Sequence, residues 1–91
     1  MSEAAYCREG HNRFTIRELL APIEQTACLC GMDYLPPFVV YGTHRLTGPD
    51  IAAHAADYRR MVLALRDGRL DARAAERHTR LNSRLDEIIV D

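Results

Sequence analysis

Three cysteines, Cys7, Cys28 and Cys30, are the most reactive side chains of this sequence. Thiolates bind zinc and act as nucleophiles, so their placement bears directly on possible chemistry. On a helix, Cys28 and Cys30 point roughly 160–200° apart and cannot face one ion, so we interpret both as small buried apolar residues. Cys7 lies in a polar loop beside Arg8, where a reactive thiol stays open as an alternative. The odd cysteine count and the lack of a secretory pattern predict a reducing, cytoplasmic setting.

The four histidines are scattered over predicted loops and helices. No HxxxH or HExxH spacing is present, so the sequence predicts no metal site. Their positions are His11, His44, His54 and His78.

All twelve basic residues are arginines, and five of them form a nearly continuous ridge near the carboxyl end, Arg69, Arg73, Arg77, Arg80 and Arg84. Such a ridge could contact nucleic-acid phosphates. Against that function, Glu76 can pair with Arg80 one turn later, and no aromatic residue is interleaved for base stacking. The net charge of the chain is −1. We therefore favour a solvated helix face and expect no nucleic-acid partner.

The composition is that of an ordinary globular domain, with 47% hydrophobic and 27% charged residues. A length of 91 residues allows one domain with a modest core. The longest apolar run, residues 35–41, is far too short to cross a bilayer, so we expect no direct membrane insertion.

Three helices are predicted, over residues 15–31, 47–67 and 71–90. The first begins with a capping box formed by Thr15 and Glu18. Pro22 lies past its first turn, which predicts a bend between Glu18 and Pro22. The apolar stripes expected to face inward are Ile16, Leu19, Leu20, Ile23, Ala27 and Cys30 in the first helix, Ile51, Ala55, Tyr58, Val62 and Leu65 in the second, and Ala74, His78, Leu81, Leu85 and Ile88 in the third.

One strand is predicted, over residues 34–42. Residues 38–41 are continuously apolar, as in a parallel strand covered on both faces, and Pro36 and Pro37 prevent ladder donation at its start. A strand buried on both faces needs neighbouring strands, and the other residues of this sequence offer none. The strand is therefore predicted to be an orphan.

Three stretches carry a resemblance to a known family: AYCREGHNRF (residues 5–14), LLAPIEQTA (19–27) and CGMDYLPPF (30–38). In order and spacing they resemble the flavodoxin-like NAD(P)H:quinone oxidoreductases. Within that family the chain is most similar to the bacterial ancillary oxidoreductases of glutathione-gated potassium-efflux antiporters. The resemblance implies an α/β fold, the C-terminal half of a flavodoxin-like doubly wound fold, in which three helices accompany one parallel-sheet strand. Residues 1–14 would then be an active-site loop within a partial oxidoreductase domain spanning the whole chain.

The resemblance also implies a reaction, in which hydride passes from NAD(P)H through FMN to a quinone. Tyr6 matches a tyrosine that lies beside the flavin ring, and Gly10 matches the loop glycine. A polar residue that helps to hold reduced flavin and quinone corresponds to Asn12 or, with a one-residue slip, to His11. Since the family's active site lies between subunits, a homodimer is implied.

Departures from the family pattern lead to two alternative functions. The family's phosphate-binding loop and aromatic-rich loop have no counterpart here, and residues 1–4 replace a Thr-Thr-Gly-Gly turn, so we expect the chain alone to bind FMN weakly or not at all. One alternative is a regulatory protein that docks on the cytoplasmic domain of a potassium-efflux antiporter, peripheral to the inner membrane. The other is an inactive, truncated fragment whose reading frame begins in mid-fold. Either way, exposed apolar surface is expected where a sheet would pack.

Overall fold

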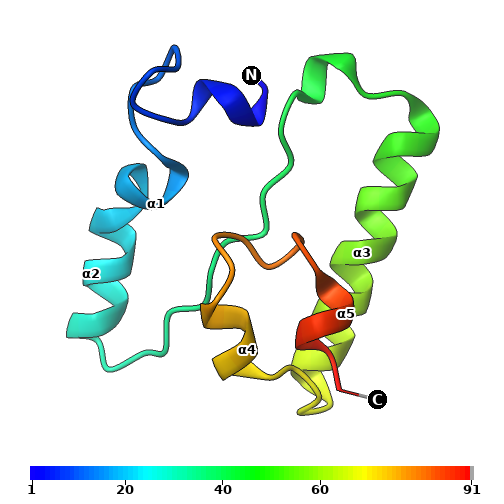
Figure 1. Ribbon diagram of the computed structural model, residues 1–91. Helices are drawn as coiled ribbons and strands as arrows, with labels where there is room; N and C mark the ends of the chain where they lie inside the picture. Colours follow the sequence, from blue (N-terminus) through cyan, green and yellow to red (C-terminus); the bar gives the residue numbers. More distant parts are fainter. Residues whose placement is uncertain (91) are drawn as a thin grey trace. The chain divides into compact units, whose positions relative to one another are not determined.

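The computed structural model describes residues 1–90, and it is mainly helical (Figure 1). The chain divides into two compact units. The first unit holds residues 1–34 and 41–44, and the second holds residues 35–40 and those from 45 onward. No β-strand is assigned within the described residues; a single antiparallel bridge joins Leu70 and Ile89.

The first unit contains the 3-10 turn η1 (Glu3–Ala5) and the helices α1 (Ile16–Leu19) and α2 (Ala21–Leu29). The predicted capping box is confirmed: the Glu18 N–H donates to Thr15 Oγ1 at 3.1 Å, and the Thr15 N–H donates to Glu18 Oε1 at 3.1 Å. It satisfies two amides that a helix start leaves without partners.

The predicted bend is also confirmed, because Leu20 separates α1 from α2. Pro22 then falls in the first turn of α2, where its missing N–H costs no helical hydrogen bond. The residues predicted as one helix over 15–31 are thus two helices in the structure.

The long helix α3 (Gly48–Arg66) has a second capping box. Thr47 Oγ1 accepts the Asp50 N–H at 3.3 Å, and Asp50 Oδ2 accepts the Thr47 N–H at 3.0 Å. Gly68, whose φ is +68°, follows the helix and supplies the left-handed conformation that commonly ends one. A short 3-10 turn, η2 (Thr43–Arg45), precedes the helix.

The predicted third helix over residues 71–90 is wrong as a continuous element. The structure has two short helices there, α4 (Ala72–Glu76) and α5 (Leu85–Ile88). Asp71 caps α4, since its Oδ1 accepts the N–H groups of the second and third residues after it at 3.0 and 3.2 Å. Residues 77–84 leave the helical path because Leu81 and Asn82 bind the distant segment 35–40 instead of continuing the helix.

The segment 35–40 lies within the predicted strand 34–42, but no ladder forms there in the described residues. The Val39 N–H donates to Asn82 Oδ1 at 3.0 Å, and Asn82 Nδ2 donates to the Val39 carbonyl at 2.7 Å. A side-chain amide therefore binds the backbone groups that a neighbouring strand would bind. The strand itself stays a prediction.

Buried apolar side chains gather in the second unit, and Ile88 is fully buried. Leu35 and Phe38 pack against this core from the segment 35–40. The predicted inward residues Leu81, Leu85 and Ile88 are confirmed. The core consists of Met61, Ala64, Ala75, Leu81, Leu85, Ile88 and Ile89.

The predicted inward faces of the other helices are wrong for the described residues. On α3 the buried residues are Met61 and Ala64, whereas Tyr58 is 54% exposed. Cys28 and Cys30 are exposed, not buried. The physical reason is the same throughout: an apolar stripe is buried only where another element covers it, and no sheet does so here. The expected exposed apolar surface is present, and it includes Leu19, Ile23, Leu29, Met32, Ile51, Tyr58, Val62 and Leu65.

Substitution of adjacent residues on α3 tests which of its faces is packed. We expect Met61→Ala to lower the free energy of unfolding by about 2–5 kcal/mol, since it leaves a cavity in the core. Val62→Ala, the neighbouring control on the exposed face, should cost about 0.5 kcal/mol or less. Urea unfolding followed by far-ultraviolet circular dichroism measures both. An equal or larger cost for Val62→Ala would contradict the packing described.

Candidate functional site

The predicted active-site loop is a closed turn held by its own backbone. The Gly10 N–H donates to the Cys7 carbonyl at 3.0 Å, and the Arg13 N–H donates to the Gly10 carbonyl at 3.1 Å. The Asn12 N–H reaches back to the Ala5 carbonyl at 2.9 Å, which closes the turn onto η1. The loop is therefore shaped by hydrogen bonds and not by a core beneath it.

Gly10 is required by close backbone packing. A Cβ atom at this position would lie 2.4 Å from the Ala4 carbonyl oxygen and 2.6 Å from that of Ala5. Real Cβ atoms do not approach backbone oxygens this closely, so any side chain at Gly10 would force the loop open. The resemblance to the quinone reductases implies a loop glycine at the same position, and its role in binding stays a prediction.

Arg13 has a backbone conformation that is uncommon for its residue type. Its φ is +61°, in the left-handed region that most residues with a Cβ avoid. The Arg13 N–H bond to Gly10 and the Phe14 N–H bond to the Asn12 carbonyl at 2.7 Å hold it there. Strained residues of this kind concentrate at functional sites, and Arg13 is one of the residues that line a cavity.

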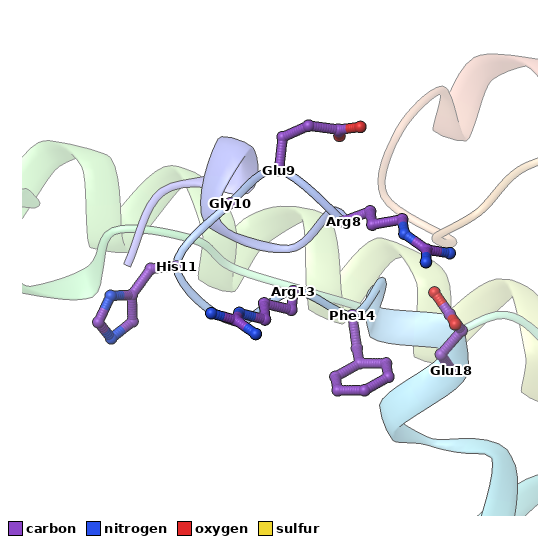
Figure 2. Close-up of a pocket in the computed structure, with 7 residues that line it drawn as sticks. All are labelled: Arg8, Glu9, Gly10, His11, Arg13, Phe14 and Glu18. Atoms are coloured by element: carbon purple, nitrogen blue, oxygen red, sulfur yellow. The ribbon is translucent and has the colours of Figure 1, made fainter.

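A cavity of about 750 Å³ lies along this loop (Figure 2). Figure 2 shows the Arg8 guanidinium reaching toward the Glu18 carboxylate and the Arg13 guanidinium reaching toward the side of His11. The Glu9 carboxylate points away from the Phe14 ring. The residues that line the cavity are Arg8, Glu9, Gly10, His11, Arg13, Phe14 and Glu18.

The cavity combines cationic side chains with an aromatic ring. Neither Arg8 nor Arg13 forms an ion pair with any residue in the described part of the chain. Guanidinium groups bind phosphate and carboxylate in fixed geometry, and the half-exposed Phe14 offers a ring face beside them. Glu9 and Glu18 line the same cavity and balance the two arginine charges, so an anionic ligand would have to bind at the guanidinium groups themselves.

Glu18 is the acidic residue of the cavity that has a defined partner. The pKa of its carboxyl is lowered from the ordinary value, first because the carboxylate accepts the Thr15 backbone N–H and second through its hydrogen bond with the Thr15 side chain. The positive charge of Arg8 lowers this pKa further. Glu18 is therefore an ionised helix cap rather than a proton donor near neutral pH.

The structure brings only part of the predicted site together. Gly10 and His11 line the cavity. Tyr6 and Asn12 are not among its lining residues: the Tyr6 ring packs on Tyr41, with ring centroids 5.5 Å apart, and Asn12 Nδ2 donates to Met1 Sδ at 3.3 Å. The roles predicted for all four site residues stay predictions.

Arg8, Arg13 and Phe14 were missed by reasoning from the sequence alone. A pattern in the sequence could have indicated them: two arginines flank a loop glycine, and an aromatic residue follows the second arginine. The left-handed backbone of Arg13 has no such signal, because arginine is not a residue that favours it.

The residues present offer separate donors for a phosphate, beside two carboxylates, and do not form a complete flavin site. Within residues 1–90 no group of three or more His, Cys, Asp or Glu side chains is placed to hold a metal ion. Arg8, His11 and Arg13 offer donors for a phosphate. Tyr6, the residue expected against a flavin ring, is instead packed on Tyr41.

Comparison with known families identifies the class of this protein. Residues 1–62 match the sequence profile of a family described as having a flavodoxin-like fold. This match covers more than half of the chain, including the closed loop, α1 and α2. The chain belongs to this flavodoxin-like family, as the resemblance of its loop and helix motifs indicated.

Within the curated proteins, the chain is similar to ancillary proteins of one transport system. The chain is 34% identical over 60 residues to the glutathione-regulated potassium-efflux system ancillary protein KefG of Cronobacter sakazakii. The aligned residues cover 66% of this chain and 33% of that protein. It is 38% identical over 56 residues to KefG of Salmonella paratyphi B, covering 62% and 31% respectively. The chain thus spans about a third of the length of the curated relatives it matches. No solved structure matches it.

None of the helices within residues 1–90 combines the length and the hydropathy that crossing a bilayer requires.

Replacing Thr15 tests the electrostatics of this loop. We expect Thr15→Ala to raise the pKa of Glu18 only part of the way toward its ordinary value, because the variant loses the side-chain hydrogen bond and keeps the backbone one, whereas Thr26→Ala, the same change on α2, should leave it unaltered. Because the pKa of Glu18 is lower in the folded chain, its contribution to stability is present above the unfolded pKa and is lost as pH falls through the folded pKa. Carboxyl titration by NMR measures this; identical Glu18 titrations in both variants would contradict the cap.

Proposed function

We propose that this chain provides the substrate-side loop of an ancillary, flavodoxin-like NAD(P)H:acceptor oxidoreductase that passes hydride to a quinone. The observation that carries the proposal is the family match over residues 1–62, because it contains the whole closed loop around Gly10. The cavity beside that loop supports it through Arg8, Arg13 and Phe14, since nicotinamide and flavin nucleotides are both anionic and aromatic.

Within this proposal each loop residue has a separate task. FMN, when bound, would supply the hydride-carrying chemistry. The Tyr6 phenol and an amide or imidazole donor from Asn12 or His11 would stabilise negative charge on an acceptor oxygen. Arg8 and Arg13 would attract the phosphates of a nucleotide, and Gly10 would keep the loop closed while they do so.

The short span of the chain limits what it does alone. It covers about a third of the relatives' length, so we expect FMN to bind weakly and turnover to require the rest of the fold. In this proposal the protein is cytoplasmic and the active form is a homodimer. A fragment without activity is the simplest competing outcome.

A second function is favoured by the names of the relatives, which are ancillary proteins of a glutathione-regulated potassium-efflux system. We propose that the parent protein docks on the cytoplasmic domain of such an antiporter. The arginine ridge is a weaker docking surface than its sequence indicates, because Arg69 pairs with Asp67 and Arg84 pairs with Glu87. Arg73 and Arg77 are exposed and are the members best placed to contact an acidic partner.

Substitution of Gly10 tests the loop directly. We expect titration with FMN to quench flavin fluorescence weakly, and Gly10→Ala to weaken that binding by about tenfold or more, because its Cβ opens the loop. Gly48→Ala is the matched control, since a Cβ there meets no atom within 4 Å.

Because turnover is expected to require the rest of the fold, the readout is the FMN affinity of the three proteins and not the reduction of menadione. A chain that binds no flavin, or a Gly10→Ala variant indistinguishable from the parent, would overturn the assignment of this loop.

A further inference from the structure

Residues 77–84, which we call the latch, connect α4 to α5 and hold a distant part of the chain. The Leu81 N–H donates to the Pro37 carbonyl at 2.8 Å, and the Asn82 side chain binds both backbone groups of Val39. An asparagine carboxamide carries a C=O acceptor and N–H donors, as a peptide unit does. Asn82 therefore offers Val39 the same pair of groups that the backbone of a neighbouring strand would offer.

The stretches on either side of the latch are tied to each other. We call them the base, and they are residues 69–76 and 85–90. The Asp71 N–H donates to the Ile88 carbonyl at 2.7 Å, and the Val90 N–H donates to the Arg69 carbonyl at 2.7 Å. Ile88 is also fully buried. The base thus has hydrogen bonds and a core that do not pass through the latch.

The latch is fixed to the base at its two ends. The Glu87 carboxylate of α5 lies 3.1 Å from His78 Nε2 and 3.5 Å from Arg84 Nη2. Between these ends, the Leu81 side chain is only 6% exposed. Opening of the latch exposes this side chain to water, and that cost keeps the latch closed in most molecules.

We propose that the latch opens as a unit while the base stays folded, so that the Val39 backbone is released without unfolding of the second unit. Segments joined to the rest of a protein by few hydrogen bonds open at a lower free energy than the core does. Glu87 keeps both ends of the latch on α5 when its middle lifts, which makes reclosing a local event.

Opening has a direct consequence for the segment 35–40. While the latch is closed, the N–H and the C=O of Val39 are both bound to Asn82, so pairing of Val39 with any other backbone requires an open latch. The segment lies within the residues that match the family, 1–62, and the latch lies outside them. This proposal uses the second unit and does not depend on the function of the loop around Gly10.

Hydrogen exchange of individual amides, followed by NMR, tests the latch. In an Asn82→Ala variant we expect the Leu81 amide to lose protection by about tenfold or more. This amide is the decisive reporter, because the substitution does not remove its own acceptor, the Pro37 carbonyl. The Asp71 and Val90 amides report on the base and should keep their protection.

Thr79→Ala is the matched control, since it changes an exposed residue of the latch and should leave these amides unaltered. The unmodified chain keeps the proposal testable if Asn82→Ala fails to fold. At low urea concentration its Leu81 and Val39 amides should open together, before the Asp71 amide and with a smaller urea dependence, because a lifted latch exposes little surface. An unchanged Leu81 amide in a folded Asn82→Ala variant, or a single transition shared by the Leu81 and Asp71 amides in the unmodified chain, would overturn the proposal.

Discussion

The hydrogen bonds between Asn82 and Val39 are the constraint on which the second unit depends. One side-chain amide satisfies both backbone groups of a residue 43 positions away, at 3.0 and 2.7 Å. Each such bond contributes only about 1 kcal/mol net, but leaving the Val39 groups buried and unpaired would cost more. The two hydrogen bonds fix the segment 35–40, from which Leu35 and Phe38 pack against the core. They also draw Asn82 out of a helical path, so residues 77–84 separate α4 from α5.

The first unit is organised on a different principle. Every buried apolar side chain in the described residues belongs to the second unit. The loop around Gly10 is held by backbone hydrogen bonds and by the close approach of Gly10 to the Ala4 and Ala5 carbonyls. Such a loop can hold cationic side chains in position without a core, but it opens easily. The chain belongs to a flavodoxin-like family and spans about a third of the length of the curated relatives it matches, and several of its apolar helix faces are exposed in the described residues.

Features set by neighbouring residues could be predicted from the sequence, and features set by distant residues could not. The Thr15 capping box and the bend before Pro22 depend on local chemistry and are present as predicted. The buried face of α3 and the broken helix over 71–90 depend on what packs against them. Among the residues that line the cavity, Gly10 and His11 were predicted from family motifs. Arg13 could not be predicted in the same way, because arginine rarely adopts the left-handed backbone conformation that it has here.

The measurement that tests this account most directly is the exchange rate of the Val39 amide, compared in the unmodified chain and in an Asn82→Ala variant. If Asn82 holds the segment 35–40, the Val39 amide exchanges slowly in the unmodified chain and loses its protection in the variant, while amides in the middle of α3 keep theirs. A Val39 amide that exchanges equally fast in both proteins would contradict the central role given to Asn82.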